Sequence, residues 1–289
     1  MLYLRTMNTN PIGLFDSGVG GLTILGRLQT CFPNESYVYV GDSGRAPYGD
    51  KSFEELYQIN KEIVAFLREK NIKMLVMACN TSCANFLDTL QQELPFPVIG
   101  LITPASKSAV LTSKNKRIAV LGTTQTISKH VYAHEIQKLL PEAQVLELAG
   151  PELVPLVESG QMFSDEGIAV CRHYMKKILD FGADTLIYGC SHYPYFEPVF
   201  KRFAPQITYI DPAKCIVPDV NLSLDTLGLY SPQTMPGLTR FFVSGDTAFF
   251  SHFLSARNRL NQEFLLESYL PVLSPGCSFS PASIPVPSL

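Results

Sequence analysis

The stretch MLVMACNT, residues 74–81, decides the fold of this chain. Its first residues form an apolar run typical of a buried β-strand, and Asn80 and Thr81 are residue types that often open a helix. Cys79 therefore falls between a strand and a helix, at the carboxyl edge of a parallel sheet. Backbone N–H groups and the helix dipole at such an edge are expected to lower the pKa of its thiol.

A second stretch, TLIYGCSH at residues 185–192, has nearly the same context. Here Cys190 follows an apolar run, and Ser191 follows the cysteine. Two such thiols, one from each half of the chain, predict a pair that faces one small substrate. The alternative is that both are buried structural cysteines, because free cysteine is among the most buried residue types.

Apolar runs alternate with amphipathic stretches along the chain, which predicts βαβ units and an α/β fold with mainly parallel sheets flanked by helices. The expected strands are 12–15, 36–40, 74–78, 98–101, 118–121, 144–147, 185–188, 207–210 and 240–243, and one expected helix is 52–70. A short strand-like run ends in turn residues near residue 100 and again near residue 211, which is consistent with two similar lobes. Residues 274–289 are rich in Ser and Pro, and we expect a disordered tail there.

The composition is that of an ordinary globular chain: 289 residues, 46% hydrophobic, 17% charged and a formal net charge of −3. That charge, without a basic stripe, argues against a nucleic-acid partner, and no apolar run approaches the ~18 residues of a membrane span. Residues 1–9 lack a signal-peptide core, and the seven cysteines are scattered. We therefore expect a cytoplasmic protein with reduced thiols.

Two loops at strand ends carry further polar chemistry. The run DSGVGGLT, residues 16–23, has glycines that let a backbone approach a ligand closely. It could cradle a phosphate, bind a carboxylate or simply form a tight turn, although it lacks the pattern of a P-loop or a G-x-G-x-x-G motif. The loop with Gly41, Asp42 and residues 47–49 is, taken alone, a plain surface turn.

Three more side chains lie near the cysteines in sequence or could reach them. His192, two residues past Cys190, could control the proton balance of that thiol, and Glu158 could orient the histidine. Each also has a plain interpretation, as a structural histidine and a solvated helix charge. Cys83 follows Cys79 by one helical turn, but no second pair at metal spacing accompanies it, so we expect no zinc site.

Five of these motifs, in order, resemble the motif set of bacterial glutamate racemases in the aspartate/glutamate racemase superfamily. They are DSGVGGLT (16–23), GD with PYG (41–42 and 47–49), ACNT (78–81), GTTQT (122–126) and GCSHYP (189–194). The resemblance covers residues 12–211 and resumes weakly at 241–246. It implies a cofactor-independent racemase of two α/β lobes, with the active site in the cleft between them. It also implies that residues 8–100 and 212–273 form the first lobe and residues 101–211 the second.

The resemblance also implies roles for particular residues. Cys79 and Cys190 resemble the two catalytic acid/base residues, with Asp16 assisting on the Cys79 side and His192 with Glu158 on the Cys190 side. The substrate-contacting set would be Asp16, Ser17, Tyr48, Gly49, Asn80, Thr81, Ser191 and His192. The chain departs from the family at Ser191, where threonine is more usual, at Cys83, which replaces a small residue, and in its extra tail. Serine keeps the hydroxyl donor and loses a methyl contact.

Two thiols suit the chemistry that inverts the configuration at Cα of an amino acid. A base on one face of Cα and an acid on the other serve both directions with swapped protonation, and nothing in the sequence calls for pyridoxal phosphate or a metal. Three functions remain open: a glutamate racemase that supplies D-glutamate for peptidoglycan, a racemase of aspartate or another small acid, or a non-catalytic amino-acid-binding protein. In each, the partner is a small molecule, with neither nucleic acid nor membrane, and a homodimer is one arrangement that the sequence leaves open.

Overall fold

A computed structural model describes residues 8–255 and 264–269 of the chain. Within these residues the strands form two sheets, and every strand pair in both sheets is parallel. The expected tail, residues 274–289, lies outside the described residues. The α/β class and the parallel sheets predicted from the sequence are confirmed.

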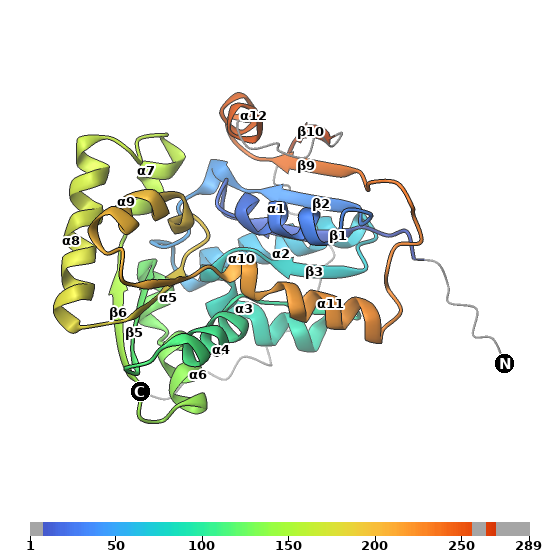
Figure 1. Ribbon diagram of the computed structural model, residues 1–289. Helices are drawn as coiled ribbons and strands as arrows, with labels where there is room; N and C mark the ends of the chain where they lie inside the picture. The colour runs from blue at the N-terminus through green and yellow to red at the C-terminus, as the bar shows by residue number, and fades with distance from the viewer. Residues whose placement is uncertain (1–7, 256–263, 270–289) are drawn as a thin grey trace.

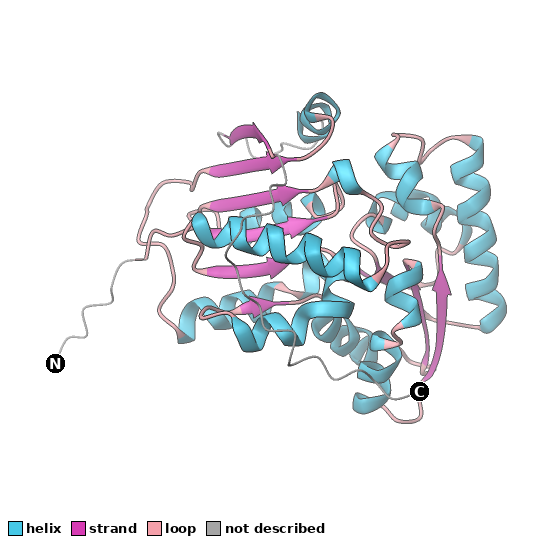
Figure 2. Ribbon diagram, turned by 180° about the vertical axis from the view of Figure 1, so that it is seen from behind, coloured by secondary structure: helices cyan, strands magenta, loops and turns pink. Residues whose placement is uncertain are grey.

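The first sheet has six described strands, and its order shows that the chain returns to it late. In spatial order the strands are β10 (Phe264–Ser268), β9 (Thr239–Val243), β2 (Tyr37–Gly41), β1 (Ile12–Asp16), β3 (Met74–Met77) and β4 (Val98–Ile99). Its helices are α1 (Leu22–Cys31), α2 (Phe53–Glu69), α3 (Asn80–Glu93), α10 (Pro212–Cys215), α11 (Val217–Thr226) and α12 (Thr247–Ser255). We call this sheet and its helices the first lobe. Figures 1 and 2 show α1 and α2 on opposite faces of the sheet.

The second sheet has four described strands and uses one continuous stretch of chain. Its spatial order is β6 (Gln144–Ala149), β5 (Arg117–Gly122), β7 (Thr185–Gly189) and β8 (Thr208–Ile210). Its helices are α4 (Ile102–Thr112), α5 (Thr124–Ser128), α6 (Val131–Leu139), α7 (Leu153–Glu158), α8 (Asp165–Phe181) and α9 (Glu197–Phe203). This second lobe lies beside the first in Figure 1. The expected lobe boundaries at residues 100/101 and 211/212 stay a prediction.

The nine expected strands are all present, with ends shifted by at most two residues. The expected helix 52–70 is α2, and it begins where Ser52 and Glu55 form a capping box in which each side chain accepts the other's backbone N–H. Strand β10 was missed. It lies at the sheet edge, where Leu265 is 51% exposed, so its side chains lack the pattern of a buried strand.

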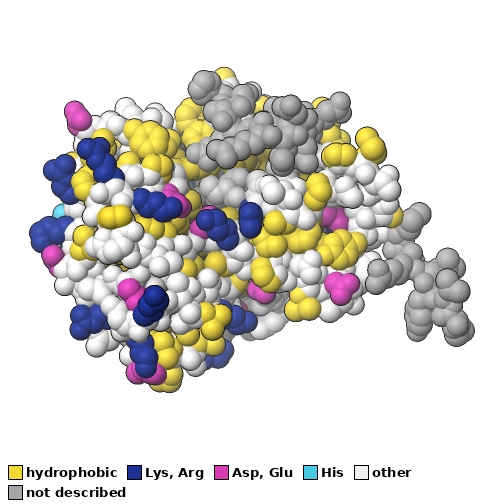
Figure 3. Space-filling view, in the orientation of Figure 1, with side chains coloured by type: hydrophobic (Ala, Val, Ile, Leu, Met, Phe, Trp, Pro, Cys, Tyr) yellow, Lys and Arg dark blue, Asp and Glu magenta, His cyan; other side chains and the backbone are white. Residues whose placement is uncertain are grey.

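The core explains why the central strands are so uniformly apolar. Strands β1, β2, β3 and β7 are buried along their whole length, as expected for parallel strands covered by helices on both faces. No helix of the described residues is long and apolar enough to cross a membrane. On the face drawn in Figure 3, basic and acidic side chains are interspersed.

Candidate active site

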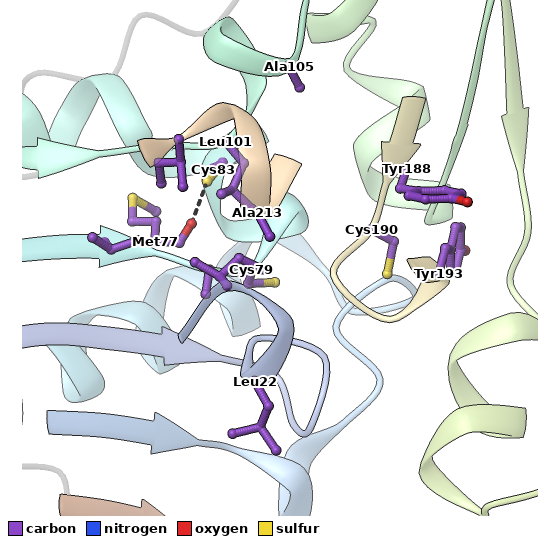
Figure 4. Packing of buried hydrophobic residues seen from close by; sticks show 14 of the residues in the cluster. Leu22, Met77, Cys79, Cys83, Leu101, Ala105, Tyr188, Cys190, Tyr193 and Ala213 are labelled. Atoms are coloured by element: carbon purple, nitrogen blue, oxygen red, sulfur yellow. Dashed lines mark hydrogen bonds between the residues drawn. The ribbon is translucent and has the colours of Figure 1, made fainter. Parts of the chain in front are cut away.

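The carboxyl ends of four strands bring the candidate residues together. Asp16 ends β1, and Cys79 follows β3 and is the N-cap residue of α3. From the second lobe, Thr123 follows β5, and Cys190 follows β7. Figure 4 shows Cys79 and Cys190 on loops of the two lobes that face each other. Both are buried, with 3% and 4% of their surface exposed.

The helix expected directly after each cysteine is present only after Cys79. After Cys190 the chain makes a turn and then a short 3-10 helix, Tyr193–Phe196, before α9 begins. A proline at position 194, near the start of that helix, has no N–H for an α-helical hydrogen bond. The Cys190 loop is therefore less regular than the sequence predicted.

The Cys79 thiol has a raised pKa, so the predicted lowering is wrong for this structure. Burial is the largest cause, and the nearby Asp16 carboxylate raises the pKa further. The backbone N–H and hydroxyl of Ser82 act in the opposite direction, as the helix start predicted, but they do not outweigh burial. Cys79 is therefore a protonated thiol in the substrate-free protein at neutral pH.

On the Cys190 side, the structure brings together the three residues that the sequence suggested. Nδ1 of His192 lies 3.8 Å from Sγ of Cys190, and Nε2 lies 2.6 Å from Oε1 of Glu158. His192 is fully buried, and burial lowers its pKa. The interactions with Cys190 and Glu158 outweigh burial and hold the pKa of His192 well above its usual value. Both contacts favour the protonated imidazole, which lies between the Glu158 carboxylate and the sulfur of Cys190.

Asp16 organises the glycine-rich loop and reaches across to the second lobe. Its Oδ2 accepts the backbone N–H groups of Gly18 at 3.1 Å and Gly21 at 2.9 Å, and its Oδ1 accepts the Ser191 hydroxyl at 2.9 Å. Burial raises the pKa of Asp16, against the charge of His192 and these hydrogen bonds. Asp16 therefore fixes the loop from within the site.

The glycines of this loop are needed because the second lobe approaches the backbone closely. A Cβ on Gly20 would lie 2.3 Å from Nδ1 of His192, and one on Gly18 would lie 2.0 Å from Oε1 of Glu158. The same Glu158 oxygen accepts the N–H of Val19 at 3.0 Å. Backbone donors at residues 18, 19 and 21 are thus already used by carboxylates, which favours close packing over a phosphate cradle at this loop.

The loop with Tyr48 and Gly49 is buried, so it is not the plain surface turn that it resembles when taken alone. The Tyr48 hydroxyl donates to Oδ2 of Asp42, whose other oxygen accepts the Ser244 hydroxyl at 2.6 Å. The carbonyl of Gly49 accepts the backbone N–H of Gln125 at 3.2 Å from the second lobe. Residues near the end of β9 therefore help to hold this loop beside the site.

Hydroxyl and amide groups of both lobes also lie at the candidate site, beside the two cysteines. The Thr81 and Thr123 hydroxyls are 2.8 Å apart, and Thr126 lies 3.0 Å from Thr123. Oδ1 of Asn80 accepts the hydroxyl of Tyr132 at 2.6 Å. Sequence reasoning assigned no role to Thr123, Thr126 or Tyr132. The GTTQT motif was a signal for the two threonines, but no local signal pointed to Tyr132.

Ser17, the remaining predicted contact, is buried in the loop after Asp16. Within the described part of the chain, no cluster of three or more His, Cys, Asp or Glu side chains is placed to hold a metal ion. The site thus presents two facing thiols, polar donors and almost no exposed surface. Such an arrangement can remove a proton from one face of a small bound molecule and return one to the other.

A family model described as Asp/Glu/hydantoin racemase matches residues 23–220. The chain belongs to this racemase family and is therefore an isomerase by class. The resemblance to glutamate racemases is confirmed by a relative from Microcystis aeruginosa named glutamate racemase, which is 42% identical over 84% of this chain and 86% of its own. A second relative of that name, from Levilactobacillus brevis, is 39% identical over 84% of this chain and 89% of its own.

Solved structures agree with the fold. A crystal structure of a glutamate racemase isoform from Bacillus anthracis has a TM-score of 0.85 and 33% identity, covering 91% of this chain and 98% of that one. The glutamate racemase from Francisella tularensis, crystallised in complex with D-glutamate, has a TM-score of 0.82 and 29% identity over the same shares. The predicted fold of two α/β lobes is thereby confirmed.

Proposed function

We propose that this protein is a glutamate racemase in which Cys79 and Cys190 move protons to and from opposite faces of Cα, supplying D-glutamate for peptidoglycan. The observation that carries the proposal is the pair of buried thiols on facing loops of the two lobes. The family membership and the named relatives support the reaction class and glutamate as the substrate.

The site offers donors for the two carboxylates of glutamate. Nδ2 of Asn80 is buried and has no hydrogen-bond partner among the described residues, so it is an unused donor inside the site. The hydroxyl of Ser17 is a further donor. The hydroxyls of Thr81 and Ser191 are bonded to Thr123 and Asp16 in the substrate-free structure, so they would have to exchange these partners for the substrate. Donors at the α-carboxylate would stabilise the negative charge that develops when the α-proton leaves.

The proton transfers follow from the two sides of the site. From D-glutamate, the Cys79 thiolate takes the α-proton and the Cys190 thiol donates one to the opposite face; from L-glutamate the roles are exchanged. The α-ammonium of the substrate adds a positive charge close to Cys79, which favours the thiolate over the thiol. Asp16 would assist beside Cys79, while His192, held by Glu158, would assist beside Cys190.

The proposed small-molecule partner of the enzyme is glutamate, and its proposed location is the cytoplasm. No cofactor is proposed. A homodimer stays a prediction, which sedimentation of the purified chain would check.

The test is circular dichroism of the purified protein with L-glutamate and, separately, L-aspartate. We expect loss of optical activity with glutamate, and we expect the rate to survive dialysis against a chelator and a carbonyl reagent. Cys79→Ser and Cys190→Ser should each lower turnover by about a hundredfold or more, because an alcohol is a much weaker acid and base than a thiol at neutral pH.

Four outcomes would contradict the proposal. Racemisation of aspartate alone would change the substrate, and activity that returned only with pyridoxal phosphate would rule out the mechanism. Serine variants with wild-type turnover in both directions would exclude the two thiols. Absence of α-proton exchange in deuterated water would favour a binding protein.

A further inference from the structure

The amide of Asn80 has one end occupied and one end free. Its Oδ1 accepts a hydrogen bond of 2.6 Å from the Tyr132 hydroxyl, whereas Nδ2 has no partner among the described residues. The side chain is only 1% exposed, so water does not readily supply that missing partner. A buried N–H without a partner is costly, and a bound ligand that accepts from it would remove the cost.

Tyr132 reaches this amide from the other lobe. Asn80 is the first residue of α3 in the first lobe, and Tyr132 lies in the first turn of α6 in the second. The tyrosine is fully buried, and burial raises its pKa well above the usual value. Its hydroxyl therefore keeps its proton over the whole range in which the enzyme would work, and it can always donate.

This single hydrogen bond decides which end of the amide faces the ligand. The two ends of an asparagine amide are nearly identical in shape, so packing alone does not distinguish them. With Oδ1 bonded to the tyrosine, the NH₂ group points the other way, as an anionic ligand requires. If the amide turned over, its oxygen would face a carboxylate, and two acceptors would oppose each other.

We propose that Tyr132 is a positioning residue of the racemase, which holds the Asn80 amide so that Nδ2 donates to a carboxylate of the substrate. This inference rests on the proposed function, because it takes glutamate as the ligand. It also makes the donor depend on the contact between the lobes, since the residue that orients the amide belongs to the opposite lobe.

The first experiment compares Tyr132→Phe with the wild-type enzyme. Phenylalanine keeps the buried ring and removes only the hydroxyl, so the fold is retained. We expect KM for both enantiomers to rise about tenfold, with a smaller change in kcat, because the amide can then turn its oxygen toward the ligand. Calorimetric binding of D-glutamate should weaken by the same factor.

Tyr37→Phe is the matched control. Tyr37 is also buried, and its hydroxyl donates to the carbonyl of Phe32 at 3.0 Å, at the opposite end of the first sheet from the site. This variant loses a comparable buried hydrogen bond and should keep the wild-type KM. An equal rise of KM in both variants would mean a general loss of structure and would overturn the inference.

A double-mutant cycle with Asn80→Ala separates positioning from packing. If Tyr132 acts through Asn80, adding Tyr132→Phe to Asn80→Ala should leave KM within about twofold of Asn80→Ala alone. The inference would be overturned if the two substitutions raised KM by factors that multiply in the double variant. A wild-type KM in Tyr132→Phe would overturn it as well. A protein that binds D-glutamate without racemising it would overturn the proposed function but leave the binding cycle decisive, and one that binds no glutamate would overturn both.

Discussion

Cys79 illustrates how the surroundings of one residue set its chemistry. Burial and the Asp16 carboxylate raise the pKa of its thiol in the substrate-free protein, although the start of α3 supplies stabilising donors. The thiolate is therefore expected to form when substrate brings its ammonium group into the site. A protonated resting thiol also protects the residue from oxidation, because the thiolate is the reactive form.

The resting state of Cys79 can be tested by alkylation with iodoacetamide. In the substrate-free protein, the rate of Cys79 modification should be slow at pH 7 and should rise about tenfold per pH unit up to at least pH 10, because the thiolate fraction rises in that way below the pKa. Peptide mapping by mass spectrometry would measure the rate, with Cys79→Ser to identify the peptide. A rate that levels off at about pH 9 to 9.5 would show a thiol with an ordinary pKa.

For single residues, the sequence predicted which side chains belong to the candidate site better than it predicted the surroundings that set their pKa values. Cys79 and Cys190 were recognisable because each lies in a short local motif. The raised pKa of Cys79 could not be predicted, since it depends mainly on burial of the thiol in the folded protein and further on Asp16, a residue far away in the chain. The same holds for Tyr132, whose contact with Asn80 exists only once the two lobes meet.

Among the elements, the glycine-rich loop between β1 and α1 is the one most tightly fitted to its surroundings. Asp16 holds it from inside, and Glu158 at the end of α7 holds the N–H of Val19 from the other lobe. His192 and Ser191 lie directly against Gly20. The glycines of the loop therefore leave the space in which Glu158, Ser191 and His192 of the second lobe approach its backbone.

Gly20→Ala should remove most of the activity and leave the fold intact. A Cβ there would lie 2.3 Å from Nδ1 of His192 and 2.5 Å from Oγ of Ser191, so both side chains must move. A displacement of this size at a reaction centre typically lowers kcat/KM by about a hundredfold. Racemisation kinetics would measure the loss, and circular dichroism would check the fold.

Gly26→Ala is the matched control, because nothing lies within 4 Å of a Cβ on this residue of α1. Alanine inside a helix is favoured over glycine by about 0.5–1 kcal/mol, so this variant should be slightly more stable and fully active. Equal activity in the two variants would show that the close approach at Gly20 has no consequence for the reaction.

The elements show where periodicity is informative and where it is not. Central parallel strands are continuously apolar and bounded by turn residues, so β1, β2, β3, β5 and β7 could be predicted. Strand β10 could not, because an edge strand is held by backbone pairing with β9 and only partly by burial. The sequence analysis missed that no helix begins directly after Cys190, although Pro194, two residues past His192, is a local signal against one.

For the whole molecule, a buried ion pair far from the site anchors the returning segment of the chain. Glu35, just before β2, pairs with Lys73, just before β3, and both side chains are almost fully buried. The other oxygen of Glu35 accepts the N–H of Ser231 at 2.7 Å. One carboxylate thus connects three separate parts of the first lobe.

Glu35→Gln should destabilise the protein strongly without changing KM. It leaves the Lys73 ammonium buried without a counter-charge, which typically costs roughly 3 kcal/mol or more. Urea denaturation would measure the free energy of unfolding. Glu142→Gln breaks the exposed pair with Lys116, whose side chains are 50% and 54% exposed, and should change stability little. Similar losses in both variants would contradict this account.

The position of β9 between β2 and β10 has a consequence for the synthesis of the protein. All four described strands of the second lobe are made before residue 211, whereas the first sheet still lacks a strand on the outer side of β2 at that moment. On the ribosome, the lobe that begins first is therefore completed last. Until β9 emerges, the nascent chain carries an open strand edge, the kind of surface on which chaperones act and aggregation starts.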